Sequence, residues 1–139
     1  MCGICGYVSR QSIRVDELTE MNNTMIHRGP DDAQRRLSIM DLSALGHQPM
    51  HSADHRVSIV YNGEIYNFQE IRQELTDYPF RSSCDTEVII AAYLKWGIHC
   101  VDRFNGMFAF CLYDRQDDSV YLVRDRMNFV MIIFILALN

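Results

Sequence analysis

Runs of apolar residues along the chain predict its strands. Such runs, rich in β-branched and aromatic residues, lie at 3–9, 37–42, 57–61, 107–113 and 120–123. The polar run 114–119 joins the last two, which predicts a hairpin. A further apolar run at 129–138 holds about half of the ~20 residues that a membrane-spanning helix needs. We expect a buried strand or a packed terminal segment there, with an abnormal tail as the alternative.

Apolar residues three or four positions apart predict three helices. They cover 16–26, 68–75 and a stretch that begins near Asp85 and ends near Trp96. Asn67 is a candidate cap of the second helix, and Asp85 or Thr86 of the third. Between them, 44–54 has the composition of a loop. Because these elements do not alternate regularly, the pattern predicts an α+β layered domain.

Length, charge and cysteine usage limit the classes of function. A chain of 139 residues suits one modest domain. Its net charge of −5 provides no basic surface for a phosphate backbone, so no nucleic acid partner is expected. The N-terminus lacks the basic and apolar regions of a secretory signal. We therefore expect a cytoplasmic protein with reduced cysteines and no membrane association.

The second residue offers the first candidate chemistry. Removal of Met1 would leave Cys2 with a thiol and a free α-amine on one residue. Their ordinary pKa values, about 8.5 and about 8, place a nucleophile and a proton acceptor close to neutral pH. The alternative is that Cys2 and Cys5 form a Cys-x-x-Cys pair with a redox or metal-binding role.

Histidine spacing raises the question of a metal site. Three histidines lie four residues apart, as ligands on one helix face would: His47, His51 and His55. Gly46 and Pro49 argue against a helix in this stretch. We therefore predict no metal site.

Five further segments add to the candidate chemistry of Cys2. In chain order they read RGPDD at 28–32, RRLSIMD at 35–41, YNGEIYN at 61–67, SCDTEV at 83–88 and NGMFAF at 105–110. Taken with Cys2, these segments resemble those of the class II glutamine amidotransferases, which are N-terminal-nucleophile glutaminase domains. The segments look most like those of the N-terminal domain of glutamine-hydrolysing asparagine synthetases. The resemblance runs through most of residues 1–126.

This resemblance implies a fold and a domain organisation. The fold is the αββα sandwich of N-terminal-nucleophile hydrolases, in which helices flank two antiparallel sheets, here in incomplete form. The glutaminase domain would occupy 1–126, with an atypical apolar tail at 127–139 and the ATP-dependent synthetase domain absent from this chain. The family's segment between Asp32 and Arg35 is normally longer, so we expect a strand to be missing just before Arg36.

The resemblance also implies a mechanism. Cys2 would attack the side-chain amide of L-glutamine, while the side-chain amide of Asn62 and the backbone N–H of Gly63 stabilise the oxyanion. Ammonia would leave, and water would hydrolyse the γ-glutamyl thioester. This half-reaction needs no cofactor, whereas ATP and magnesium are expected only in the absent synthetase domain, which would use the ammonia to amidate aspartate. A homodimer is an oligomeric option.

Substrate binding is assigned in the same way. Arg36 matches the family's carboxylate-binding arginine, and Asp85 matches the residue that binds the α-ammonium group. Three more positions would complete the glutamine pocket: Leu37, Ile39 and Glu64. The structural alternatives are a surface ion pair for Arg36, a helix cap for Asp85 and a hairpin turn for the Asn-Gly pair.

Two alternative functions therefore remain beside the glutaminase. One is a catalytically inactive relative that keeps the motifs without the active geometry, as a binding module or with no role. The other is the Cys-x-x-Cys redox or metal-binding protein.

Overall fold

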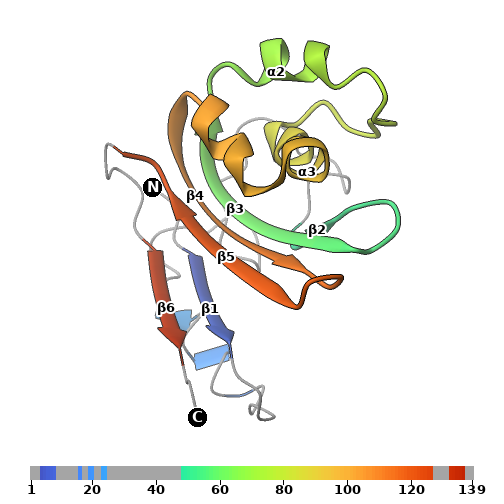
Figure 1. The fold of residues 1–139 in the computed structure, drawn as a ribbon. Coiled ribbons are helices and arrows are strands. Elements are labelled where there is room, and N and C mark those ends of the chain that lie inside the picture. The colour runs from blue at the N-terminus through green and yellow to red at the C-terminus, as the bar shows by residue number, and fades with distance from the viewer. Residues whose placement is uncertain are drawn as a thin grey trace.

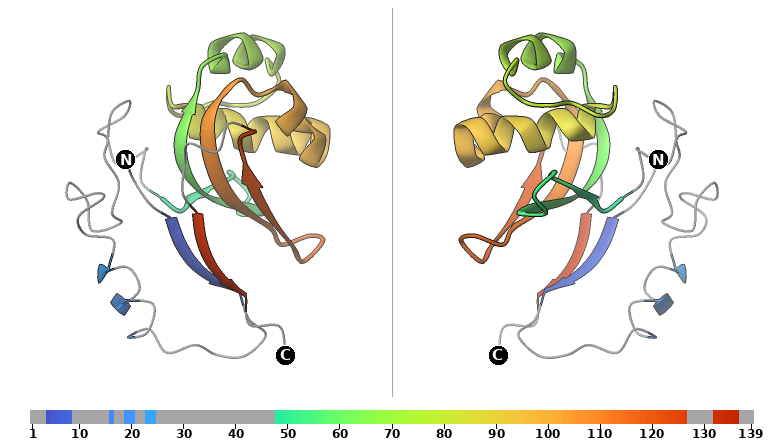
Figure 2. Two further views of the ribbon diagram at one scale, coloured as in Figure 1. Left: turned by 90° about the vertical axis from the view of Figure 1, so that its left-hand side faces the viewer. Right: turned by 90° about the vertical axis from the view of Figure 1, so that its right-hand side faces the viewer.

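The computed structural model of the protein describes residues 4–8, 16, 19–20, 23–24, 48–126 and 132–136, with 4–8 and 132–136 described by their backbone alone. Within these residues, a four-stranded sheet carries helices on one face, and a separate pair of strands lies on its other side (Figures 1 and 2). The predicted α+β class is confirmed.

The four-stranded sheet is antiparallel throughout. Its order is β2 (Met50–His51), β3 (Val57–Ile65), β4 (Gly106–Asp114) and β5 (Ser119–Arg124). The three longer strands and the predicted hairpin are confirmed. β3 continues to Ile65, four positions past the predicted end at Tyr61, and pairs with β4 along its whole length. β2 lies in the segment that was expected to be a loop. A strand of only two residues beside Pro49 has too short an apolar pattern to be predicted from the sequence.

Two α-helices cover one face of this sheet. They are α2 (Phe68–Glu74) and α3 (Asp85–Trp96), and the 3₁₀-helix η3 (Gly97–Arg103) follows α3 directly. α3 packs on β3, and α2 packs on α3 (Figure 2). The predicted second and third helices are confirmed. Within the predicted first helix, the described residues Asp16, Thr19, Glu20 and Asn23 are helical.

The junction between β3 and α2 differs from the prediction. Asn67 occupies the N-cap position of α2, but its side chain makes no capping hydrogen bond. Instead its Nδ2 donates to the carbonyl of Arg103 at 2.9 Å, and its Oδ1 accepts from the backbone N–H of Asn105 at 2.9 Å. Asn67 therefore ties α2 to the segment that leads into β4.

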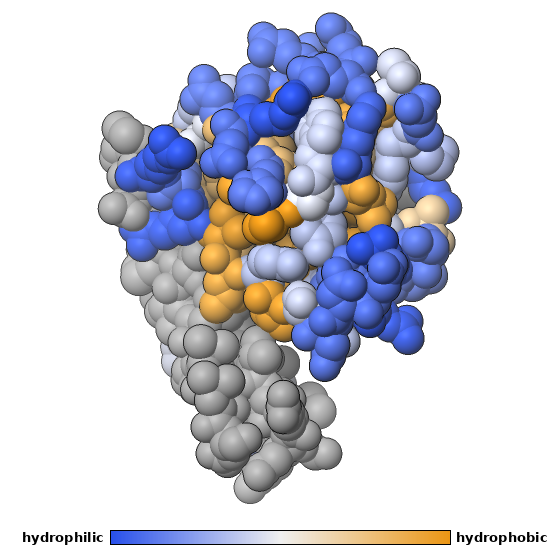
Figure 3. Space-filling view, in the orientation of Figure 1, coloured by the Kyte–Doolittle hydropathy of each residue, from blue (hydrophilic) through white to orange (hydrophobic). Residues whose placement is uncertain are grey.

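Burial alternates along the central strands and places the core under the helices. Val57, Ile59, Tyr61 and Ile65 of β3 are buried on the helical face. Phe108, Phe110 and Leu112 of β4 join them there. The opposite face exposes three large apolar side chains: Met107, Val120 and Leu122. Figure 3 shows apolar residues gathered in the middle of one side of the molecule, with polar residues around them.

The second sheet contains the two ends of the described chain. β1 (Ile4–Val8) pairs with β6 (Ile132–Leu136), and β1 also contacts β3. The strand predicted at 3–9 is thus confirmed, and the apolar run, expected to be a buried strand or a packed terminal segment, contains a strand. This pair runs parallel, whereas the expected sandwich has two antiparallel sheets. The four-stranded sheet and its helices lie between β1 and β6 in the chain. A connection of this length, unlike a hairpin, allows the two strands to pair in parallel.

Some expectations fall on residues outside this description. These include the strand at 37–42 and the shortened connection between Asp32 and Arg35. Among the described residues, no helix is both long enough and apolar enough to cross a membrane.

Candidate active site

The Asn62–Gly63 pair lies inside β3. Asn62 is opposite Ala109 of β4 and Gly63 is opposite Phe108. The pair is therefore not a hairpin turn, and that alternative is wrong. The sheet continues through Ile65, and the chain turns toward α2 only after it.

Hydrogen bonds along β3 show which way its backbone groups point. The backbone N–H of Tyr61 donates to Oε1 of Gln48 at 2.5 Å, and the Tyr61 carbonyl accepts from Nε2 of Gln48 at 2.7 Å. The backbone N–H of Ile65 donates to Oδ2 of Asp85 at 3.1 Å. Both residues thus direct their N–H groups to the edge of β3 that faces away from β4. In a regular antiparallel strand every second residue points the same way, so the N–H of Gly63 points to this edge as well.

The partner strand supports this orientation. Phe108, opposite Gly63, donates its N–H to Oδ2 of Asp125 at 3.1 Å and accepts the Asp125 N–H at 2.9 Å. Its backbone groups therefore point toward β5 and not toward Gly63. β2 reaches only Ser58 and Ile59 of β3, and the Gln48 side chain extends the pairing as far as Tyr61. Among residues 48–126, no group pairs with the Gly63 N–H on this edge, which lies between two occupied positions.

A side chain at position 63 would not fit. Gly63 has φ +138°, a conformation that residues with a Cβ rarely adopt, and a Cβ there would lie 2.1 Å from the carbonyl oxygen of Met107. The close approach of β3 and β4 therefore requires glycine. This requirement holds whatever the chemical role of the N–H group.

Asp85 lies beside the same stretch of β3. It is the first residue of α3 and is only 4% exposed. Its Oδ2 accepts the Tyr61 hydroxyl at 2.5 Å as well as the Ile65 N–H. The N-cap position belongs to Cys84, and no side chain makes a capping bond there, so the capping alternative for Asp85 is wrong. The carboxylate instead connects the start of α3 to both sides of the Asn62–Gly63 pair.

The Tyr61 hydroxyl remains a donor at neutral pH. Burial raises the pKa of Tyr61 far above its ordinary value, and the nearby Asp85 carboxylate raises it further. The phenol therefore stays protonated, and its proton is directed at the carboxylate.

A second buried carboxylate shapes the loop that leads to Asp85. Glu87, 5% exposed, accepts the backbone N–H of Arg81 at 2.9 Å on Oε1. Its Oε2 accepts both the backbone N–H and the hydroxyl of Ser82 at 2.7 Å. Three donors of the loop therefore bond to one side chain of α3, which holds the loop in place just before Asp85.

The remaining predicted site residues divide into two groups. Glu64 is exposed on β3 opposite Met107, on the face away from Tyr61. The others lie outside the described residues: Cys2, Arg36, Leu37 and Ile39. The structure therefore brings together Asn62, Gly63 and Asp85, and the assigned roles of all these residues stay predictions.

Three cysteines have described side chains, and all three are buried or partly buried: Cys84, Cys100 and Cys111. Burial raises the pKa of the Cys100 thiol to about 12 and also raises that of Cys111. Cys84 is buried, with its Sγ 3.0 Å from the hydroxyl of Ser82. The thiols of Cys100 and Cys111 are therefore harder to ionise than a free thiol, and the thiol of Cys84 is enclosed.

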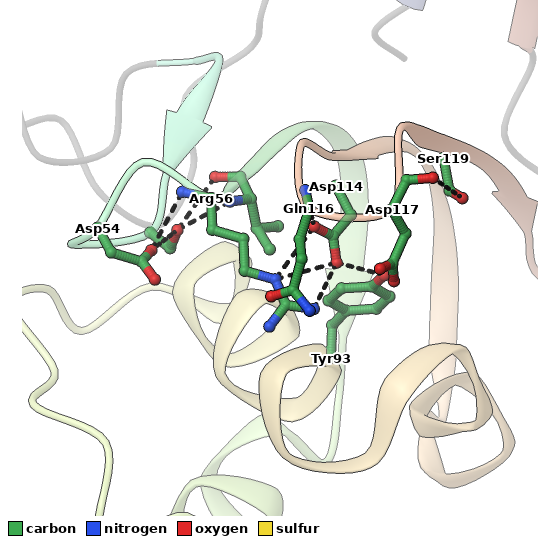
Figure 4. Close-up of polar contacts among 9 residues, drawn as sticks. Asp54, Arg56, Tyr93, Asp114, Gln116, Asp117 and Ser119 are labelled. Carbon is green, nitrogen blue, oxygen red and sulfur yellow. Dashed lines mark hydrogen bonds and ion pairs between the residues drawn. The ribbon is translucent and has the colours of Figure 1, made fainter.

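The far end of the sheet holds a separate polar cluster, drawn in Figure 4. Asp114 of β4 is fully buried and accepts two bonds from Arg56, with Nη2 at 2.8 Å and Nε at 3.1 Å. The Tyr93 hydroxyl and the Gln116 N–H donate to the same carboxylate, each at 2.9 Å. These hydrogen-bond partners of Asp114 all belong to the protein itself, which indicates a structural role for the cluster. No group of three or more metal-ligating side chains occurs among the described residues.

Comparison with known proteins identifies the family. The family model described as "Glutamine amidotransferase domain" matches residues 1–134.

The chain belongs to the glutamine amidotransferase domain family.

Curated relatives of this amidotransferase domain agree with that assignment. The chain is 36% identical to the putative asparagine synthetase [glutamine-hydrolyzing] 2 of Methanocaldococcus jannaschii, over 92% of this chain and 30% of that protein. It is 37% identical to asparagine synthetase [glutamine-hydrolyzing] 2 of Bacillus subtilis, over 91% of this chain and 19% of that protein. The chain thus spans less than a third of the length of these relatives.

A solved structure supports the fold. Glutamine phosphoribosylpyrophosphate amidotransferase of B. subtilis, complexed with ADP and GMP, matches with a TM-score of 0.51 and 16% identity, over 69% of this chain and 25% of that one. At this identity the match concerns the fold alone. It supports an amidotransferase fold for this domain.

The alignment with the archaeal relative also carries information on length. It runs over 158 residues although this amidotransferase domain has only 139, so the relative contains residues with no counterpart here. The expected shortening between Asp32 and Arg35 stays a prediction.

Sequence reasoning missed three residues that organise the candidate site. Tyr61 holds Asp85, Gln48 holds the backbone of Tyr61, and Glu87 holds the loop before Asp85. Tyr61 and Glu87 lie inside the recognised segments YNGEIYN and SCDTEV, so their position next to assigned residues was a usable signal. Gln48 had none, because its partner is distant in sequence.

Proposed function

We propose that this chain is a glutaminase domain of the asparagine-synthetase type, which releases ammonia from the side chain of L-glutamine. The observation that carries the proposal is the open backbone N–H of Gly63 on the edge of β3, next to the buried carboxylate of Asp85. A candidate oxyanion donor and a candidate site for the α-ammonium group thus lie along one strand, in a chain of the glutamine amidotransferase domain family.

The proposed first step forms a bond between Cys2 and the amide carbon of glutamine. The thiol proton passes to the α-amine of Cys2, and the thiolate attacks, which leaves negative charge on the amide oxygen. The Gly63 N–H and the Asn62 side-chain amide donate to this oxygen. Loss of one such donor typically costs roughly 3 kcal/mol of transition-state stabilisation.

The following steps release the products. The carbon–nitrogen bond breaks, the leaving nitrogen takes the proton held by the α-amine, and ammonia departs. Water then attacks the γ-glutamyl thioester and gives its proton to the same amine. The carbon–sulfur bond breaks, glutamate is released and the Cys2 thiolate recovers its proton.

Recognition of the amino-acid end of glutamine would use two opposite charges. Arg36 would hold the α-carboxylate through its guanidinium group, and Asp85 would hold the α-ammonium group. Leu37, Ile39 and Glu64 would line the rest of the pocket. The hydrolytic steps use only groups of the protein and water, so we propose that no cofactor takes part in them.

The ammonia needs an acceptor. By similarity to the synthetases, we propose an ATP-dependent synthetase domain or subunit as the partner, with ATP and magnesium bound there and aspartate as the acceptor. This part of the proposal rests on relatives of which the chain covers less than a third.

The first experiment measures intact mass before and after exposure to a diazo-ketone analogue of glutamine, together with ammonia release from glutamine. We expect loss of Met1, one covalent adduct and ammonia release. Cys2→Ser should abolish both the adduct and ammonia release, while Cys5→Ser should retain them. Activity that depends on Cys5 would favour the Cys-x-x-Cys alternative.

The length difference favours one second candidate, a relative that binds glutamine without hydrolysing it. Residues present in the archaeal synthetase and absent here could include part of the nucleophile's surroundings. A folded chain that has lost Met1 but gains no adduct and releases no ammonia would contradict the glutaminase proposal and support this candidate.

A further inference from the structure

We infer that Tyr61 is a positioning residue for recognition of the substrate's α-ammonium group: its hydroxyl fixes one oxygen of Asp85 so that the other oxygen is presented to that group. This inference deepens the proposed function and rests on it. Its basis is the arrangement of hydrogen bonds around Asp85.

The two oxygens of Asp85 have different surroundings. Both hydrogen bonds that the carboxylate accepts, from the Tyr61 hydroxyl and the Ile65 N–H, end on Oδ2. Within residues 48–126, no hydrogen bond or ion pair ends on Oδ1. Asp85 is 4% exposed, and a buried carboxylate oxygen is costly unless a donor or a cation meets it. An ammonium group of a substrate would supply both.

Tyr61 itself is held firmly enough to orient another side chain. Its backbone N–H and carbonyl are both bonded to the Gln48 side chain, at 2.5 and 2.7 Å. Its own side chain is 5% exposed in the core, and its hydroxyl lies 2.5 Å from Oδ2 of Asp85, as expected for a charge-assisted bond.

The same strand carries the proposed oxyanion donors. Tyr61 immediately precedes Asn62 and Gly63, and Ile65 follows them. Since Asp85 is bonded to both Tyr61 and Ile65, the position of the α-ammonium group is set relative to that of the amide to be cleaved. Without the Tyr61 hydroxyl, the Ile65 N–H is the one remaining donor among residues 48–126 that bonds to the Asp85 carboxylate. A carboxylate held by a single hydrogen bond can rotate about it.

The structure offers a matched control for the variant Tyr61→Phe. Tyr93 is also 5% exposed, and its hydroxyl also donates to a buried aspartate, Asp114, at 2.9 Å. The variant Tyr93→Phe therefore removes the same group from the same kind of bond, at the other end of the sheet. Any general cost of losing a buried phenol hydroxyl appears in both variants.

The experiment compares kinetics and inhibition in the wild type and these two variants. The measurements are KM and kcat for L-glutamine, and inhibition constants for L-glutamate and glutarate, which differ only in the amino group. In Tyr61→Phe we expect KM for glutamine and the inhibition constant of glutamate to rise about five- to tenfold, as for the loss of one orienting hydrogen bond. The values of kcat and of the glutarate constant should stay within about twofold. Tyr93→Phe should leave all four unchanged.

Each contrary result has a distinct meaning. Equal weakening of glutamate and glutarate in Tyr61→Phe, or the same profile in both variants, would overturn the positioning role while the glutaminase proposal stands. A wild-type chain that neither releases ammonia nor binds glutamate in calorimetry would overturn the proposed function, and the role of Tyr61 with it.

Discussion

At the scale of single residues, backbone geometry restricts the candidate site more tightly than side-chain chemistry does. Gly63 has φ +138° and no room for a Cβ, while Asp85 keeps its place through bonds to the strand on both sides of Gly63. The requirement for glycine at this position therefore comes from the close approach of the two strands, and it is independent of the role proposed for the Gly63 N–H.

The variant Gly63→Ala tests this restriction, and Gly97→Ala is its control. Gly97 also has positive φ, at +64°, but a Cβ there meets nothing within 4 Å. Gly97→Ala should therefore cost only the backbone strain, roughly 1–3 kcal/mol. Gly63→Ala should cost more than Gly97→Ala in urea unfolding, because β3 must also separate from the Met107 carbonyl. Equal losses in the two variants would contradict the close approach.

At the scale of elements, the polar groups that join helices to strands are specific pairs rather than general surface charges. Asp114 joins β4 to Tyr93 of α3 and to Arg56 at the start of β3. Asn67 joins α2 to the residues before β4. Each such group connects segments that are distant in sequence, and each has a measurable consequence.

The Asp114 cluster predicts a dependence of stability on pH. Hydrogen bonds from Arg56, above all, hold the pKa of Asp114 at about 2, below the ordinary value of 3.8. A carboxylate with a lowered pKa in the folded state stabilises the fold above its unfolded pKa, and this contribution is lost as the pH falls. We expect the urea midpoint to drop between about pH 4 and pH 2.

The control for this prediction changes the neighbouring carboxylates one at a time. Asp114→Asn should lower the midpoint at pH 7 and flatten its fall toward pH 2. Asp117→Asn removes the same charge from an exposed position in the adjoining turn and should leave the profile as in the wild type. A profile for Asp114→Asn as steep as that of the wild type would assign the acid sensitivity to other groups.

Asn67 provides a test at the start of α2. If its side chain acted as a helix cap, Asn67→Asp would be harmless, because aspartate caps equally well. Since Nδ2 donates to the Arg103 carbonyl instead, we expect Asn67→Asp to lower the free energy of unfolding by about 1 kcal/mol. Urea unfolding measures this loss, and unchanged stability would restore the capping interpretation.

These elements also show which parts of the fold the sequence alone could predict. The apolar patterns of α3 and of the three longer strands were sufficient to locate these elements, although α3 is buried on every side from Asp85 to Tyr93. β2 and the parallel β1–β6 pair were not predictable in this way, since a two-residue strand has no period and a strand's pattern does not reveal its partner.

The site was predictable in its members but not in their contacts. Resemblance to the family identified Asn62, Gly63 and Asp85 together as candidate site residues. Two local signals misplaced these residues, because Asn-Gly is a common turn sequence and aspartate is a common cap. Pairing with β4 overrode the first signal, and the bonds from Tyr61 and Ile65 to the carboxylate overrode the second.

At the scale of the whole molecule, the two faces of the four-stranded sheet differ. α2 and α3 cover one face, and Phe108, Phe110 and Leu112 are buried beneath them. On the other face Met107 and Leu122 are each 39% exposed, and Val120 is 36% exposed. An apolar sheet face that stays accessible favours self-association and the binding of hydrophobic dyes.

Dye binding tests the accessibility of this second face. The variant Leu122→Lys places a charge in the middle of β5 on the exposed side, where the side chain can remain in water. We expect the fluorescence of an anilinonaphthalene sulfonate dye bound to the native protein to fall by roughly half, and light scattering at high concentration to fall with it. Gln116→Lys adds the same charge in the exposed turn between β4 and β5 without removing an apolar side chain, so it should leave dye fluorescence unchanged. Equal effects of the two substitutions would mean that net charge controls association, whereas an effect of Leu122→Lys alone would assign it to this face of the sheet.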